Sequence, residues 1–396
     1  MNDPSELSAS EARRLIGIGE LSPTELLEAC IRRIEAVNPQ INAIVSTDLN
    51  RARKEAKIAE KAVLAGSTLP PLHGLPIGIK DLNATEGLRT TWGSKLFENF
   101  VPTEDEALVA RLKAAGGIIV GKTNTPEFGS GTATNNLVFG PTRNPFDLER
   151  TSGGSSGGAA AALATNMLPL CQGGDTGGSL RNPATWCGVV GFRSTPGLVP
   201  QENRTLNYTH FNVQGPMARS VPDIALMMTG CVGNDERDPM ANICDPQAFL
   251  NIKPANLKNV RVAWTEDFGG VAPLDDGIRR CFKRVIGALK NTFQSLDGQN
   301  PNFSDARDCF WTLRCVNYLA SHKLRYEKNR DILSPNIIAN VEAGEKMSLA
   351  GRKSSKKFLK NPFKICEKLR YESIQTRRGM YMGHSTWRER YNLRQR

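Results

Sequence analysis

The hydrophobic positions in the first third of the chain alternate between helical and extended spacing. Amphipathic segments predict helices over residues 47–66 and 106–115. Short uninterrupted apolar runs predict buried strands over residues 75–80 and 118–120. This succession of strand, helix and strand favours an α/β fold with a mostly parallel sheet.

Two opening helices are predicted by the residues that begin them. Ser8 followed by Glu11, and Ser22 followed by Glu25, have the spacing of capping boxes. In the second of these, Pro23 occupies the first helical position, where its missing N–H costs nothing. We therefore expect helices over residues 8–19 and 23–37.

The pattern changes after residue 129. Residues 129–158 consist mostly of Gly, Ser, Thr, Asn and Pro, and loops this rich in glycine usually bring the backbone close to another group. Beyond this stretch we expect a helix over residues 159–164, strands over 168–172, 189–193 and 260–264, and a helix that begins at Asp276.

Composition excludes several classes of protein. The chain has 396 residues, of which 39% are hydrophobic and 23% charged, so it can bury a sizeable core. No apolar run approaches the roughly 18–20 residues of a membrane helix, and the first residues do not resemble a secretory signal. Nine scattered cysteines without a CxxC pair favour reduced thiols in the cytoplasm over disulfides or a zinc site.

The net charge of +11 is confined to the end of the chain. Residues 351–396 contain 14 Lys and Arg against 3 Glu, which leaves the first 350 residues neutral. The basic character therefore describes a tail, and it gives no reason to expect nucleic acid at the main body.

Two short motifs match known patterns but lack the context that those patterns need. Residues 116–123 match GxxxxGK[ST], yet the interior of the match is itself an apolar strand and a turn follows it, so we expect a buried strand. Residues 153–157 match GxSxG, the nucleophile elbow of α/β-hydrolases. That interpretation needs a later histidine, and His210, His322 and His384 lie in no conspicuous turn.

A third set of motifs is more specific because it has several parts in order. These are GIKD at residues 78–81, GGSSGG at 153–158, DTGGSLRNPA at 175–184 and GVVGF at 188–192. Lys80 precedes Ser155 by 75 residues, and Ser155 precedes Ser179 by 24. These motifs and spacings resemble the amidase signature family over roughly residues 8–350. The resemblance implies an α/β fold with a mixed central sheet flanked by helices.

The resemblance also implies a catalytic apparatus for amide hydrolysis. It assigns the nucleophile to Ser179 and the base to Lys80, which acts through Ser155 after a cis peptide bond. It places oxyanion and substrate contacts at Gly129, Ser155, Thr176, Gly177, Gly178 and Ser179. No metal or organic cofactor is expected. Asp175 is expected to hydrogen-bond the nucleophile loop, and Arg181 either pairs behind the nucleophile or orients a substrate carboxylate.

Elementary chemistry supports these residue types. Lysine acts as a base only when neutral, so the pKa of Lys80 must fall from its reference of about 10.4. The apolar run before Lys80 favours this, because burial disfavours the ammonium. The adjacent Asp81 opposes this fall in the pKa of Lys80 if its carboxylate faces the lysine. A hydroxyl both donates and accepts, so Ser155 can relay a proton.

We expect a domain over residues 1–350, with its motif core at 75–195, and a separate basic tail over 351–396. The strands that normally follow in the family are expected to be missing from this C-terminal stretch. The predicted reaction converts an amide to a carboxylate and ammonia or an amine through an acyl-enzyme on Ser179.

Three alternatives stay open beside this reaction: the glutaminase subunit of an aminoacyl-tRNA amidotransferase, a catalytically impaired amidase, and a module that binds RNA through its basic tail. We expect a small amide substrate, no membrane segment and no specific nucleic acid, and we leave a homodimer open.

Overall fold

A computed structural model describes residues 3–206 and 208–347. The predicted basic tail over residues 351–396 lies outside the described residues. The described chain divides into two compact units. The first contains residues 3–252 with Arg325–Ile338, and the second contains Lys253–Leu324 with residues 339–347. All the motif residues lie in the first unit.

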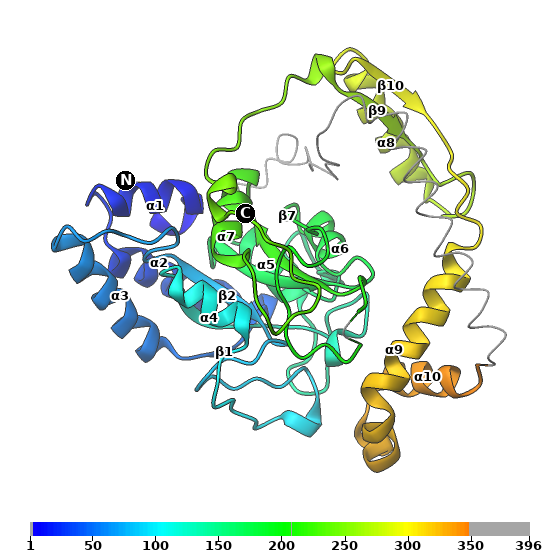
Figure 1. The fold of residues 1–396 in the computed structure, drawn as a ribbon, viewed down its shortest axis with the longest axis horizontal. Helices are drawn as coiled ribbons and strands as arrows, with labels where there is room; N and C mark the ends of the chain where they lie inside the picture. Colours follow the sequence, from blue (N-terminus) through cyan, green and yellow to red (C-terminus); the bar gives the residue numbers. More distant parts are fainter. Residues whose placement is uncertain (1–2, 207, 348–396) are drawn as a thin grey trace. The chain divides into compact units, whose positions relative to one another are not determined.

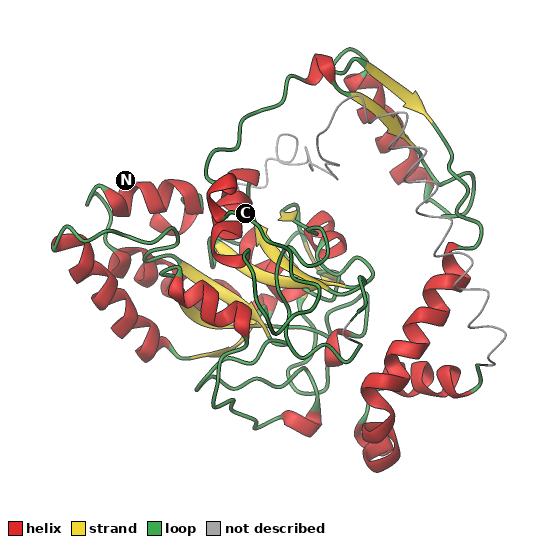
Figure 2. Cartoon of the chain, viewed as in Figure 1, coloured by secondary structure: helices red, strands yellow, loops and turns green. Residues whose placement is uncertain are grey.

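A six-stranded sheet forms the centre of the first unit, with helices beside it (Figures 1 and 2). Its strand order is β1-β3-β2-β6-β8-β7. The bounds are β1 (Ile44–Thr47), β2 (Pro76–Lys80), β3 (Ile118–Thr123), β6 (Leu170–Asp175), β7 (Val190–Gly191) and β8 (Val213–Ala218). A separate hairpin joins β4 (Arg143–Asn144) to β5 (Asp147–Thr151).

The sheet is mixed, as the family resemblance implies, so the mostly parallel sheet expected from the hydrophobic pattern alone is wrong. Strand β2 runs parallel to both of its neighbours, β3 and β6, whereas the β1–β3, β6–β8 and β7–β8 pairs are antiparallel. The antiparallel pairs come from β1 and β8, which the hydrophobic pattern does not reveal. Strand β8 reads VQGPMA, and a Gly-Pro pair is a poor signal for a strand.

Ten α-helices occur in the described chain. They are α1 (Ala9–Gly17), α2 (Pro23–Ile41), α3 (Leu49–Leu64), α4 (Ala107–Ala114), α5 (Gly157–Ala164), α6 (Arg181–Trp186), α7 (Val221–Cys231), α8 (Asp276–Leu289), α9 (Ala306–Asn329) and α10 (Pro335–Glu345). The Ser8 and Ser22 hydroxyls accept from the N–H groups of Glu11 and Glu25, as predicted. The Glu25 carboxylate also accepts from the Ser22 N–H, which completes the second capping box.

Helix α5 packs on strands β2, β3, β6 and β8 and is built almost entirely of alanine and glycine. Small residues allow a helix to approach a sheet closely. A Cβ on Gly158 would lie 2.3 Å from the Asn124 nitrogen and 2.6 Å from the Ala43 carbonyl oxygen. The sequence Gly157-Gly158-Ala159 therefore fixes how near α5, and the serines just before it, lie to β2.

The second unit contains a strand–helix–strand motif. Strands β9 (Arg261–Trp264) and β10 (Ser295–Gly298) pair in parallel, and helix α8 connects them in the chain. The Trp264 and Phe282 rings meet edge to face at 5.8 Å. Both β9 and α8 begin within a residue of their predicted positions.

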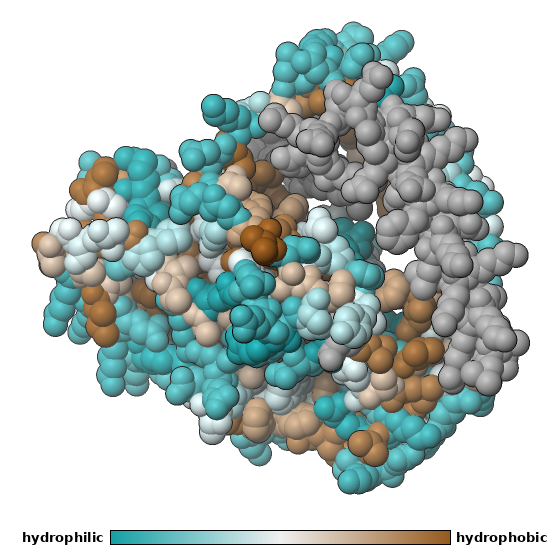
Figure 3. All heavy atoms as spheres, viewed as in Figure 1, coloured by the Kyte–Doolittle hydropathy of each residue, from teal (hydrophilic) through white to brown (hydrophobic). Residues whose placement is uncertain are grey.

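The surface of the first unit is mainly polar on the face shown in Figure 3, with apolar side chains in scattered groups. Most of the buried apolar residues of the first unit form one cluster, with members from Ala9 to Val232. No helix within residues 3–206 and 208–347 is long and apolar enough to cross a membrane.

The close approach at Gly158 predicts a specific cost. Gly158→Ala should lower the free energy of unfolding by about 1–3 kcal/mol, because the added methyl group meets backbone atoms that cannot rotate away. Gly287→Ala in helix α8 is the control, since nothing lies within 4 Å of its Cβ position. The control should be neutral or stabilise by less than about 1 kcal/mol in urea unfolding. Equal stability of the Gly158 variant and wild type would contradict the close packing.

Candidate active site

Lys80 is the last residue of β2, and every residue of that strand is buried. Its side chain is only 1% exposed. The Nζ atom donates to the Ser155 Oγ atom at 2.7 Å and to the Ser156 Oγ atom at 2.8 Å. Its backbone N–H donates to the Gln172 side chain on β6 at 3.1 Å, which fixes the end of the strand.

Burial lowers the pKa of Lys80 to about 7, against a smaller opposing influence of Asp175. The neighbouring Asp81 does not oppose this shift, because its carboxylate accepts from the Thr91 N–H and from the Thr91 hydroxyl at 2.5 Å. The orientation of Asp81, which the sequence leaves open, is therefore away from Lys80. A lysine with such a pKa is neutral in a large fraction of molecules at neutral pH.

Ser155 and Ser156 lie in the loop before α5. The Gly154–Ser155 peptide bond is cis, as the family resemblance implies. Sequence reasoning missed Ser156 as a partner of Lys80, although the serine doublet in GGSSGG contains it. The Ser156 hydroxyl also donates to the Gly174 carbonyl oxygen at 3.3 Å, so it connects Lys80 with β6.

The Ser179 loop, defined as residues 176–179, follows the end of β6. Asp175 is buried there, and its carboxylate accepts from the N–H of Gly178 at 2.8 Å and of Leu180 at 3.2 Å. The expected role of Asp175 in holding this loop is thus present. The Gly178 N–H, expected to face the substrate, is instead taken by Asp175.

The remaining N–H groups of the Ser179 loop belong to Thr176, Gly177 and Ser179. Among the residues that the structure describes, none accepts a hydrogen bond from the N–H of Thr176, Gly177 or Ser179. Thr176 and Gly177 are exposed and Ser179 is half-buried. Backbone donors without a protein acceptor at the end of a strand are suited to an anionic oxygen.

Ser179 lies against the serine doublet through its backbone. The Ser156 N–H donates to the Ser179 carbonyl oxygen at 3.2 Å. The structure joins Lys80 to Ser155 by a hydrogen bond, but within the described residues it gives the Ser179 hydroxyl no such bond to Ser155. Catalytic hydrogen bonds are often long without substrate and tighten when it binds.

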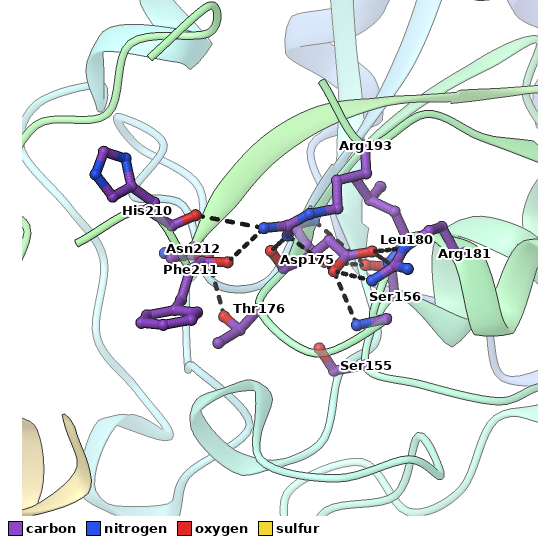
Figure 4. Close-up of polar contacts among 12 residues, drawn as sticks. Ser155, Ser156, Asp175, Thr176, Leu180, Arg181, Arg193, His210, Phe211 and Asn212 are labelled. Carbon is purple, nitrogen blue, oxygen red and sulfur yellow. Dashed lines mark hydrogen bonds and ion pairs between the residues drawn. The ribbon is translucent and has the colours of Figure 1, made fainter. Parts of the chain in front are cut away.

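Two arginines share the Asp175 carboxylate (Figure 4). Arg181 binds it through two nitrogens at 2.9 and 3.1 Å, and Arg193 donates to it at 3.0 Å. Burial raises the pKa of Asp175, but the hydrogen bond and charge of Arg181, with Arg193 and the Gly178 N–H, lower it to about 2. Arg181 therefore pairs with Asp175 behind the Ser179 loop, which corresponds to one of its two expected roles.

Gly129 lies beside Ser155. Its φ is +72°, and a Cβ there would lie 3.5 Å from the Ser155 Oγ atom. The nearby Glu127 is buried and holds this segment in place. Its carboxylate accepts from the Ser94 hydroxyl at 2.6 Å and from the Ser334 N–H at 2.7 Å.

Neither the GxxxxGK[ST] match at residues 116–123 nor the GxSxG match at residues 153–157 has the structural context that its pattern requires. Residues 118–123 form strand β3, and Lys122 is fully buried, so a phosphate-binding loop is excluded there. Ser155 is bonded to a lysine, and no histidine among the described residues forms a hydrogen bond with it. This arrangement does not fit the Ser–His pair of an α/β-hydrolase.

Comparison with known proteins agrees with this geometry. The family profile described as Amidase matches residues 25–376. An acylamidase of Rhodococcus erythropolis is 36% identical over 344 residues, which cover 86% of this chain and 72% of the acylamidase. A glutamyl-tRNA(Gln) amidotransferase subunit from Roseiflexus sp. (strain RS-1) is 45% identical over 289 residues. These residues cover 72% of this chain but only 58% of that subunit, so the chain spans less than two thirds of its length.

Solved structures show the same fold. A bacterial aryl acylamidase of the amidase signature enzymes family superposes with a TM-score of 0.83 at 27% identity, over 92% of this chain and 78% of that chain. A fatty acid amide hydrolase also superposes with a TM-score of 0.83, at 23% identity, over 94% of this chain and 68% of that chain. The expected mixed α/β architecture is thus confirmed, and the chain belongs to the amidase family of amide-bond hydrolases.

Proposed function

We propose that this chain hydrolyses carboxylic amides to a carboxylate and ammonia or an amine, through an acyl-enzyme on Ser179. The observation that carries the proposal is Lys80, a fully buried lysine with a lowered pKa whose Nζ atom lies 2.7 Å from the Ser155 Oγ atom. A lysine whose Nζ atom contacts two serine hydroxyls can serve as a base. It has a chemical use if one of those serines passes a proton to it.

In the proposed first step, neutral Lys80 accepts the proton of Ser155 while Ser155 accepts that of Ser179. The Ser179 oxygen then forms a bond with the amide carbon. The carbonyl oxygen becomes negative, and the N–H groups of Thr176, Gly177 and Ser179 stabilise it. Removal of one such donor in comparable sites costs about 2.7–4 kcal/mol of activation free energy.

In the proposed second step, the tetrahedral carbon expels the nitrogen, which takes the proton back from Lys80 through Ser155. The C–N bond breaks and an acyl ester on Ser179 is left. Water attacks this ester by the same proton path in reverse, which releases the carboxylate and restores the Ser179 hydroxyl. Ser156 holds the Nζ atom of Lys80 in line for both transfers.

A second function has its own support. The amidotransferase subunit is more similar to this chain than the acylamidase, at 45% against 36% identity, although over a shorter alignment. In that case the same residues would release ammonia from glutamine, and partner subunits would be required. Turnover of simple amides by the isolated chain favours the first function, and turnover of glutamine only with partners favours the second.

Location and assembly complete the proposal. We place the chain in the cytoplasm, because the eight cysteines in the described residues carry free thiols. Five of these cysteines are fully buried. A homodimer stays a prediction.

The first test concerns the nucleophile. A serine-directed fluorophosphonate should label the wild type and should not label Ser179→Ala, because only an activated serine reacts at a useful rate. Ser67→Ala, at an exposed serine outside the motifs, is the control and should label like the wild type. Equal labelling of the Ser179 variant would remove Ser179 from the mechanism. A wild type that is folded but unlabelled would instead indicate a catalytically impaired amidase.

The second test concerns pH. The rate constant kcat/KM should rise with pH through a midpoint near 7, because the lowered pKa of Lys80 makes it neutral above that value. Lys80→Ala should lose several orders of magnitude in kcat with binding of substrate largely kept. A profile that falls between pH 6 and 8 would contradict a lysine base.

A third test uses the serine that the sequence did not single out. The Ser156 hydroxyl accepts from Nζ and so favours the ammonium form of Lys80. Ser156→Ala should therefore lower the pKa of Lys80 and move the midpoint of the pH profile to lower pH, in addition to lowering kcat. A midpoint that moves to higher pH would show that Ser156 does not stabilise the ammonium.

A further inference from the structure

Arg193 connects the Ser179 loop with a segment outside the motifs. It follows β7, and its side chain is 23% exposed. One terminal nitrogen donates to the Asp175 carboxylate at 3.0 Å and to the Asp175 carbonyl oxygen. The other donates to the carbonyl oxygens of Phe211 at 3.0 Å and of His210 at 3.4 Å (Figure 4).

Neutralisation of Asp175 does not account for these contacts. Arg181 already binds both oxygens of that carboxylate. Arg193 differs from Arg181 in that it also binds three backbone carbonyl oxygens on two separate segments. A planar guanidinium with donors on both edges can hold two chain segments at a fixed separation, which a lysine ammonium does less well.

The segment that Arg193 holds reaches the Ser179 loop directly. Residues 210–212 lead into β8, whose Val213 pairs with Asp175. The Thr176 hydroxyl donates to the Asn212 side-chain oxygen at 3.3 Å. In Figure 4, the Phe211 ring lies near the Thr176 side chain, whereas the His210 ring points away. Phe211 is a half-buried apolar residue of this segment and directly precedes Asn212, the residue that Thr176 binds.

We propose that Arg193 is a positioning residue that holds Phe211 against one side of the Ser179 loop, and that Phe211 contacts the substrate. The proposal rests on the proposed amide hydrolysis. A carbonyl oxygen bound by the Thr176 and Gly177 N–H groups places the groups on either side of the amide within reach of Phe211. An aromatic ring at that position favours amides that carry an aryl or alkyl group over the smallest ones.

The experiment compares kcat/KM for acetanilide, benzamide and acetamide. Relative to wild type, Phe211→Ala should lower the ratio of the preferred aryl amide to acetamide about tenfold or more, since loss of apolar contact discriminates by roughly that factor. Arg193→Met should lower the same ratio by a similar factor, mainly through KM. Arg193→Lys should give an intermediate ratio, because it keeps the charge and only part of the donor set.

Two controls separate this effect from general damage. Tyr208→Ala removes an exposed aromatic side chain from the same segment and should leave the ratio unchanged. Arg150→Met breaks an exposed ion pair with Asp147 and should also leave it unchanged. If Arg193→Met fails to fold, Phe211→Ala and Arg193→Lys still decide the outcome.

The outcomes distinguish the two proposals. A wild type that hydrolyses none of the three amides and is not labelled at Ser179 overturns the proposed function. A wild type that is active, with the same substrate ratio in the Phe211 and Arg193 variants, overturns the role of Arg193 and Phe211 and leaves the proposed function intact. An equal fall in kcat for all three amides would mean that Arg193 supports the Ser179 loop alone, which also overturns the proposal.

Discussion

The burial of the Lys80 ammonium is the constraint around which this site is arranged. A charged group in an apolar strand is costly unless it is neutralised or solvated by the protein. Here the two hydroxyls of Ser155 and Ser156 provide the polar contacts, and the lowered pKa shows how far the charge is disfavoured. Helix α5 has to pack close to the sheet so that the loop before it, which carries both serines, reaches the end of β2. The small residues of α5 allow this close packing.

Asp175, at the end of the neighbouring strand β6, is a buried group whose charged form is stabilised. It is a buried carboxylate that stays ionised because two arginines and two backbone N–H groups surround it. Its charge holds the Ser179 loop in one conformation, and it also limits how far the pKa of Lys80 falls. The two buried charges on adjacent strands thus determine both the shape of the loop and the strength of the proposed base.

The sequence predicts local structure and the motif residues well, because both depend on neighbours in the chain. The capping box of Ser22, the buried strand that ends at Lys80 and the helix that begins at Asp276 all have local signals. Strand β1 escapes prediction because it has only four residues, IVST, of which two are apolar, and β8 because of its Gly-Pro pair. Ser156 and Arg193 acquire their partners only in three dimensions, from residues up to 76 positions away.

The proposed catalytic residues Lys80, Ser155 and Ser179 are compatible with both proposed functions, so the difference between an acylamidase and a glutaminase subunit would come from the residues around them. Two charged side chains, Glu127 and Arg193, hold the chain segments around these residues in place. Glu127 ties the segment beside Gly129 to Ser334, and Arg193 ties residues 210–211 to the Ser179 loop. Each joins the motif core to a stretch of chain outside the motifs. Specificity can therefore change through those outer stretches while the geometry at Lys80, Ser155 and Ser179 stays as it is.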